Sequence, residues 1–93
     1  MSVVEEARSI APALTELFYD IHRCPELGRQ ERRTAALIRR RLEELGVEYV
    51  PLADTGTAAV IRGAKPGRTI GFRADIDALP ITEETGLPYA SQT

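Results

Sequence analysis

The sequence predicts an α/β fold in which two amino-terminal helices pack on the first strands of a mixed sheet. Residues 10–21 and 35–45 carry apolar side chains at steps of three and four, as expected of helices with one buried face. From Val47 onwards this repeat is lost, and turn-forming glycine and proline residues become frequent. Two helices followed by strands are typical of a sheet with helices packed on one face.

The first helix is expected to begin at Ser2, because Ser2 and Glu5 have the spacing of a capping box. Pro12 lies inside the apolar pattern, where a proline either kinks a helix or marks a first turn that begins at Ala11. Pro25 is expected to end this helix, since the residue before a proline avoids the helical region.

The second helix is expected at about residues 31–45, and Gly46 is placed for the left-handed position that follows a helix end. On this helix Arg39-Arg40-Arg41 is followed closely by Glu43-Glu44. Such a mixed run of charges predicts a solvated helix face rather than a phosphate-binding patch.

Strands are expected at residues 47–52, 58–62 and 69–75. The loop at residues 63–67 is rich in glycine and proline, which predicts a hairpin between the second and third strands. A three-stranded sheet would leave two open edges, so the domain is expected to continue beyond Thr93.

Length and composition describe an ordinary small globular chain. The chain has 93 residues and a net charge of −2, and this length is enough for one small domain and not for two. The near-neutral charge argues against a nucleic-acid partner. No run approaches the roughly 20 apolar residues of a membrane span. Cys24 is the only cysteine, so no internal disulfide can form, and the expected location is the cytoplasm.

Asp75 and Asp77 are the sharpest local feature of the sequence. Residues two apart in a strand point to the same side, so the two carboxylates could lie near a cation or raise one another's pKa. The alternative is structural: one aspartate caps the following turn and the other is solvated.

His22, Cys24 and Glu26 lie close together in the sequence, but their spacing fits no standard zinc arrangement. His22 is the only histidine, so no second one is present to activate Cys24 as a nucleophile. From residue types alone, the chain does not assemble an active site.

Four ordered stretches carry a resemblance to a known family. Residues 21–28 (IHRCPELG) resemble a His-x-x-Pro-Glu-Leu-Gly signature, and three more match in the same order: 33–36 (RTAA), 72–81 (FRADIDALPI) and 83–89 (EETGLPY). They resemble metal-dependent amidohydrolases of the zinc-carboxypeptidase and aminoacylase-like metallopeptidases. This branch includes hippurate hydrolases, N-acyl-amino-acid amidohydrolases and indole-acetyl-amino-acid hydrolases.

The resemblance implies the start of a catalytic α/β domain that is interrupted, farther along the chain, by a smaller dimerisation or lid domain. Such an enzyme hydrolyses the amide bond of an N-acyl amino acid with water activated by a divalent metal, Zn or Mn. In the family the metal ligands lie beyond the position of Thr93, so no ligand is carried onto this chain. Residues 1–93 alone are therefore expected neither to hydrolyse a substrate nor to bind metal tightly, and any homo-oligomer would form through the absent domain.

Within the resemblance, Asp77 matches an acidic position beside the active site, where it would orient a ligand or the metal-bound water. Asp75 could share that region. His22 and Glu26 match the first signature and are expected to fix the turn between the two helices.

Two alternatives remain open at the level of sequence. The chain could be a free-standing binding or regulatory module that adds a partner strand to its open sheet edge. A weaker alternative is a small complete enzyme that uses the pair Asp75 and Asp77 as its site.

Overall fold

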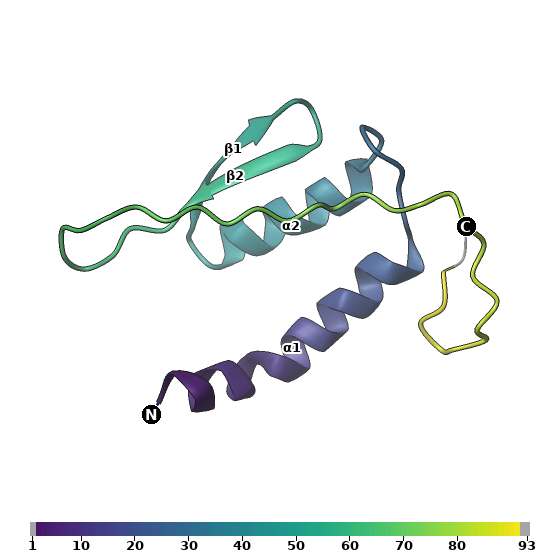
Figure 1. Cartoon of the computed structure of the whole chain (residues 1–93), viewed down its shortest axis with the longest axis horizontal. Helices are drawn as coiled ribbons and strands as arrows, with labels where there is room; N and C mark the ends of the chain where they lie inside the picture. The colour runs from purple at the N-terminus through teal and green to yellow at the C-terminus, as the bar shows by residue number, and fades with distance from the viewer. Residues whose placement is uncertain (1, 92–93) are drawn as a thin grey trace. The chain divides into compact units, whose positions relative to one another are not determined.

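The computed structural model describes residues 2–91, which form two helices and a two-stranded sheet (Figure 1). In chain order these are α1 (Val3–Arg23), α2 (Arg32–Glu44), β1 (Glu48–Leu52) and β2 (Gly56–Val60). Neither helix in this part of the chain has the length and apolar character needed to cross a membrane.

The chain divides into two compact units. The first comprises Met1–Pro25 and Pro80–Thr93, and it contains α1. The second comprises Glu26–Leu79, and it contains α2 and the two strands.

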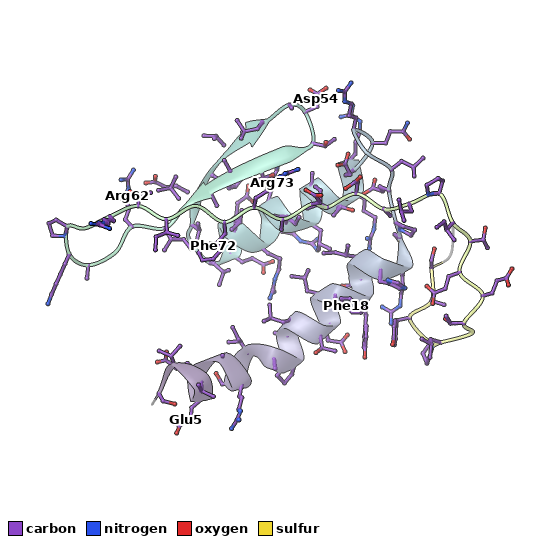
Figure 2. The ribbon with its side chains drawn as sticks, viewed as in Figure 1. Glu5, Phe18, Asp54, Arg62, Phe72 and Arg73 are labelled. Atoms are coloured by element: carbon purple, nitrogen blue, oxygen red, sulfur yellow. The ribbon has the colours of Figure 1, made fainter. Side chains whose placement is uncertain are left out.

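Helix α1 begins as predicted, because the Ser2 hydroxyl accepts a hydrogen bond from the Glu5 amide at 3.1 Å. The helix continues through Pro12, so the alternative start at Ala11 is wrong. It ends at Arg23, two residues before the proline that predicted its end. Its apolar stripe is largely exposed in the described chain, as the ring of Phe18, labelled in Figure 2, illustrates.

The end of α2 also follows the prediction. Gly46 has a φ of 70°, and its amide donates to the Glu43 carbonyl at 3.1 Å. The Val47 amide donates to the Leu42 carbonyl at 2.9 Å, which completes a Schellman motif. Backbone amides therefore satisfy the carbonyl groups of Leu42 and Glu43 without a side chain.

The hairpin joins β1 to β2, not the second predicted strand to the third. The two strands are antiparallel, and the pair that closes the hairpin is Leu52 with Gly56. Ala53 and Asp54 in the turn have φ values of 48° and 67°. A Cβ atom on Gly56 would lie 2.7 Å from the Leu52 carbonyl oxygen, so this position requires glycine. Figure 2 shows Asp54 at this turn.

The strand predicted at residues 69–75 is not formed, and the chain there is irregular (Figure 1). In the described chain the sheet consists only of β1 and β2, so this segment has no ladder to join. Ile70 is 77% exposed and Phe72, labelled in Figure 2, is 96% exposed. Apolar residues indicate a strand, but a strand also needs a neighbour to supply its hydrogen bonds.

The buried residues of α2 are Thr34, Ala35 and Leu37, and the second unit also buries Glu31 and Thr55. The helix is attached to the hairpin by Arg39, which was predicted to be solvated with the rest of its triplet. The Arg39 guanidinium instead donates to the Thr57 hydroxyl at 2.9 Å and to the carbonyls of Gly56 and Asp54 at 2.8 and 3.1 Å. The guanidinium fork suits this cluster of acceptors, and a flexible point charge would not.

Candidate functional site

The signature at residues 21–28 places a carboxylate at the start of α2. Glu26 accepts hydrogen bonds from the amide of Arg33 at 2.9 Å and from the amide of Thr34 at 2.6 Å. The Thr34 hydroxyl donates to the same carboxylate at 2.6 Å. The first amides of a helix have no partner within the helix and carry partial positive charge, so a carboxylate there both caps and stabilises it. Glu26 therefore fixes the turn before α2, as predicted.

The hydrogen bonds at Glu26 also set its charge state. Partial burial raises the pKa of this carboxyl group, but the bonds from the Thr34 side chain and from the amides of Arg33, Thr34 and Arg32 outweigh that effect. The net result is a pKa below the ordinary value of 4.5. Glu26 is therefore ionised at neutral pH.

The loop that begins with Glu26 lies against the segment that holds the acidic pair. The Ala78 amide donates to the Glu26 carbonyl at 2.8 Å. A Cβ atom on Gly28 would lie 3.5 Å from Oδ2 of Asp77. Residues about fifty positions apart, from the first and third matching stretches, are thus brought together in the second unit.

Asp75 has a different environment from Asp77. Its carboxylate pairs with Arg73 at 3.0 Å, and both side chains are largely exposed to solvent. Because residues 69–75 form no strand, the argument that placed both carboxylates on one side of a strand does not apply. The roles of Asp75 and Asp77 near an active site remain predictions.

A second polar cluster lies in the first unit, around Glu83. His22 Nε2 is 2.6 Å from Glu83 Oε1, which also accepts from the Ser91 amide at 3.0 Å. The hydroxyl of Thr85 donates to the other carboxylate oxygen. Beside this cluster the ring of Tyr89 stacks on Tyr19, with centroids 4.1 Å apart.

The network at Glu83 holds its carboxyl group in the ionised form. The hydrogen bond from Thr85 and the amide of Ser91, with a further contribution from His22, lower the pKa of Glu83 from 4.5 to about 2. His22 therefore fastens the segment around Glu83 to the end of α1. This contact was not foreseen, because Glu83 lies 61 residues from His22 in the sequence.

A sequence signal for the Glu26 contact did exist. The residue at the N-cap position of α2 is Glu31, which makes no capping hydrogen bond with its side chain. Instead its carboxylate accepts from the buried hydroxyl of Thr55 at 3.1 Å. A helix without Ser, Thr, Asp or Asn at its start needs another acceptor, and Glu26 is the next acidic residue before Glu31 in the sequence.

Across residues 2–91, no three side chains of His, Cys, Asp or Glu converge on a point where they could hold an ion. His22 is engaged with Glu83 and Glu26 with the start of α2, so the local trio with Cys24 does not form a ligand set.

The capped helices, the hairpin and the turn that adjoins Asp77 form part of an α/β domain. No protein-family model matches the chain. It is 48% identical over 80 residues to the N-acetyldiaminopimelate deacetylase of Oceanobacillus iheyensis, which is 84% of this chain and 22% of the relative. It is 51% identical over 73 residues to the N-acetyl-L-cysteine deacetylase of Bacillus subtilis, which is 77% of this chain and 18% of the relative.

A solved structure agrees with these relatives. The Bacillus subtilis YXEP protein, a dinuclear metal-binding peptidase of the M20 family, is 43% identical and superimposes with a TM-score of 0.85. The match covers 92% of this chain and 24% of that one. In sequence and in fold, the chain therefore corresponds to the amino-terminal part of metal-dependent amidohydrolases of the M20 family.

The chain spans about a fifth of the length of these curated relatives. A divalent metal belongs to the full-length family, since the structural neighbour binds two metal ions. The described residues of this chain do not by themselves fit such a centre, because they bring no set of ligands together.

Proposed function

We propose that residues 1–93 are part of the catalytic domain of an amidohydrolase that removes the acyl group from N-acyl amino acids, with N-acetyl amino acids as the first substrates to test. The proposal is supported by the two deacetylases that the chain matches at 48% and 51% identity. In the proposal these residues form the scaffold beside the active site, and they contribute no metal ligand.

The observation that carries the proposal is the junction between the first and third matching stretches, residues 21–28 and 72–81. The hydrogen bond from the Ala78 amide to the Glu26 carbonyl joins them at 2.8 Å. It places Asp77 next to a turn that the Glu26 carboxylate holds rigid. An acidic side chain on a fixed loop is suited to orienting a neighbouring catalytic group.

The direct test is a chimeric enzyme. The amino-terminal part of the Bacillus subtilis N-acetyl-L-cysteine deacetylase is replaced by the aligned residues of this chain, and release of acetate from N-acetyl-L-cysteine is followed. We expect the chimera to be active, because the exchanged segments share 51% identity over 73 residues. A folded chimera that releases no acetate would contradict the proposal.

A matched variant and the isolated chain complete the test. The chimera with Asp77→Asn is expected to keep its fold and lose much of its kcat. The isolated 93 residues are expected to release no acetate, with or without added zinc or manganese. Turnover by the isolated chain would show that it carries a complete active site and would refute the scaffold role.

The same proposal places the reaction in the cytoplasm, which a chain with one cysteine fits. Its partner is a small-molecule substrate, and neither a nucleic acid nor a membrane is involved. Any homo-oligomer would form through a domain that follows these residues in the enzyme.

One observation favours the alternative, a free-standing binding module. Only β1 and β2 pair in the described sheet, and apolar residues at the end of β2 are exposed, Val60 to 50% and Ile61 to 83%. A peptide could add a strand at such an edge. Cooperative unfolding of the isolated chain, with well-dispersed NMR spectra, would support the module. A molten, aggregating chain would contradict it.

A further inference from the structure

We infer that the loop at residues 26–28 positions the carboxylate of Asp77, and that Glu26 and Gly28 are therefore positioning residues for the reaction proposed above. The inference rests on the proposed function and adds the residues that hold Asp77 in place. Neither residue is assigned a contact with substrate.

Glu26 connects two parts of the second unit through two different groups. Its carboxylate is fixed at the start of α2 by the amides of Arg33 and Thr34. Its carbonyl oxygen accepts the Ala78 amide, which belongs to the peptide unit directly after Asp77. Movement of Asp77 away from the loop would break the hydrogen bond between Ala78 and Glu26. Movement of the loop at residues 26–28 would break the bonds between the Glu26 carboxylate and the start of α2. Through Glu26, the position of Asp77 is therefore fixed relative to helix α2.

Gly28 contributes by lacking a side chain. Its backbone is not left-handed, since the glycines with positive φ in the described chain are Gly46 and Gly86. Its conformation therefore does not require glycine. An added Cβ atom would stand in ordinary contact with Asp77 Oδ2, at 3.5 Å. The γ carbons of a longer side chain would compete with the carboxylate for the same space.

These contacts distinguish Asp77 from its neighbour Asp75. Asp75 pairs with an exposed arginine two residues earlier, and within residues 2–91 no side chain of another element forms a hydrogen bond or ion pair with either residue. Asp77 instead meets a loop that two sets of hydrogen bonds fix. Of the two aspartates, Asp77 is the one whose position the fold determines.

The test compares Gly28→Val with Gly28→Ala and with Gly67→Val. Gly67 has open space around its Cβ position and no positive φ, so it is the matched control. In the isotope-labelled chimeric enzyme, Gly28→Val is expected to shift the side-chain carboxyl resonance of Asp77 and to speed exchange of the Ala78 amide about tenfold. Gly28→Ala and Gly67→Val are expected to leave both unchanged. Equal effects of the Gly28→Val and Gly67→Val variants would overturn the inference.

A second variant distinguishes a local effect on Asp77 from unfolding caused by the valine side chain. Glu26→Gln keeps the size of the side chain and removes its charge, so the cap weakens while the loop stays free of clashes. We expect the Asp77 resonance to shift in the same direction, with the amides of β1 and β2 still protected. An unchanged Asp77 resonance in this variant would overturn the role assigned to Glu26.

Kinetics in the chimeric enzyme separate positioning from structure. Gly28→Val is expected to lower kcat by the same factor as Asp77→Asn, on the order of 10–100-fold, with little change in KM. The double variant should be no slower than either single one. Full activity of Gly28→Val or of Asp77→Asn would overturn the inference. An inactive unsubstituted chimera would contradict the proposed function alone, and the NMR comparison would then decide the inference.

Discussion

The carboxylate of Glu26 binds both the amide and the hydroxyl of Thr34, eight residues later, at 2.6 Å each. Thr34 is 1% exposed, so its hydroxyl has no access to water as a substitute partner. The signature at residues 21–28 therefore provides, through Glu26, the cap of α2, a helix that begins after the signature ends.

Removing this carboxylate should destabilise the chain. For Glu26→Ala we expect a loss of about 1–3 kcal/mol in the free energy of unfolding, because the cap is lost and the Thr34 hydroxyl is left buried without its acceptor. Urea denaturation followed by circular dichroism measures this loss. Glu16→Ala, on the exposed surface of α1, is the control and should change stability by less than about 0.5 kcal/mol. Equal stability of the two variants would contradict the capping role.

The contact between α2 and the hairpin depends on the shape of a guanidinium group. Arg39→Lys keeps the charge but is not expected to reach Thr57 and the carbonyls of Asp54 and Gly56 together. We expect a loss of about 1–3 kcal/mol in the free energy of unfolding and faster amide exchange in β2. Arg40→Lys, at the exposed neighbouring position, is the control, and the prediction fails if the two variants behave alike.

The contact between His22 and Glu83 should respond to acid. The pKa of Glu83 is lowered from 4.5 to about 2 in the folded chain, so its stabilising contribution is complete above pH 4.5. This contribution is lost as the pH falls from 4.5 through about 2. We expect the NMR contacts between the rings of Tyr19 and Tyr89 to be lost as the pH falls over this range. In Glu83→Gln the contacts should be weak at every pH, and an ordinary titration of Glu83 near 4.5 would contradict the assignment.

The hairpin should tolerate no side chain at its closing position. Gly56→Ala would bring a Cβ atom to 2.7 Å from the Leu52 carbonyl oxygen, so the turn must open. We expect a loss of about 1–3 kcal/mol in the free energy of unfolding and weaker protection of the amides in β1. Gly67→Ala, where no atom lies within 4 Å, should leave both unchanged. Stable, fully protected β1 in Gly56→Ala would refute the hairpin geometry.

Local patterns predicted the helices well because the signals for their ends are local. Ser2 and Glu5 predicted the start of α1, and Gly46 predicted the end of α2, since caps act within a few residues. The strands were harder, because the partner of a strand depends on distant parts of the chain. The glycine and proline residues at 63–67 indicated a turn correctly, but the segment after it found no partner strand in the described chain.

The candidate site was only partly predictable for the same reason. The sequence pointed to Asp77, but the contact with Gly28 joins residues nearly fifty positions apart. Arg39 was misassigned as solvated, because a charge pattern does not reveal which carbonyl groups a fold will present to it. The motifs of the family resemblance identified both stretches, and the fold supplied the contact between them.

The cap at Glu26 also limits the insertions and deletions that the loop at residues 27–31 can accept. Five residues, 27–31, span the distance from this carboxylate to the first turn of α2, and the Ala78 amide fixes the same loop from its other side. An insertion or deletion there would pull the carboxylate away from the amides it binds. The exposed loop at residues 63–67 has no such tie within the described chain. Among homologous genes, we therefore expect gaps in the alignment to collect at 63–67 and to be missing from 27–31.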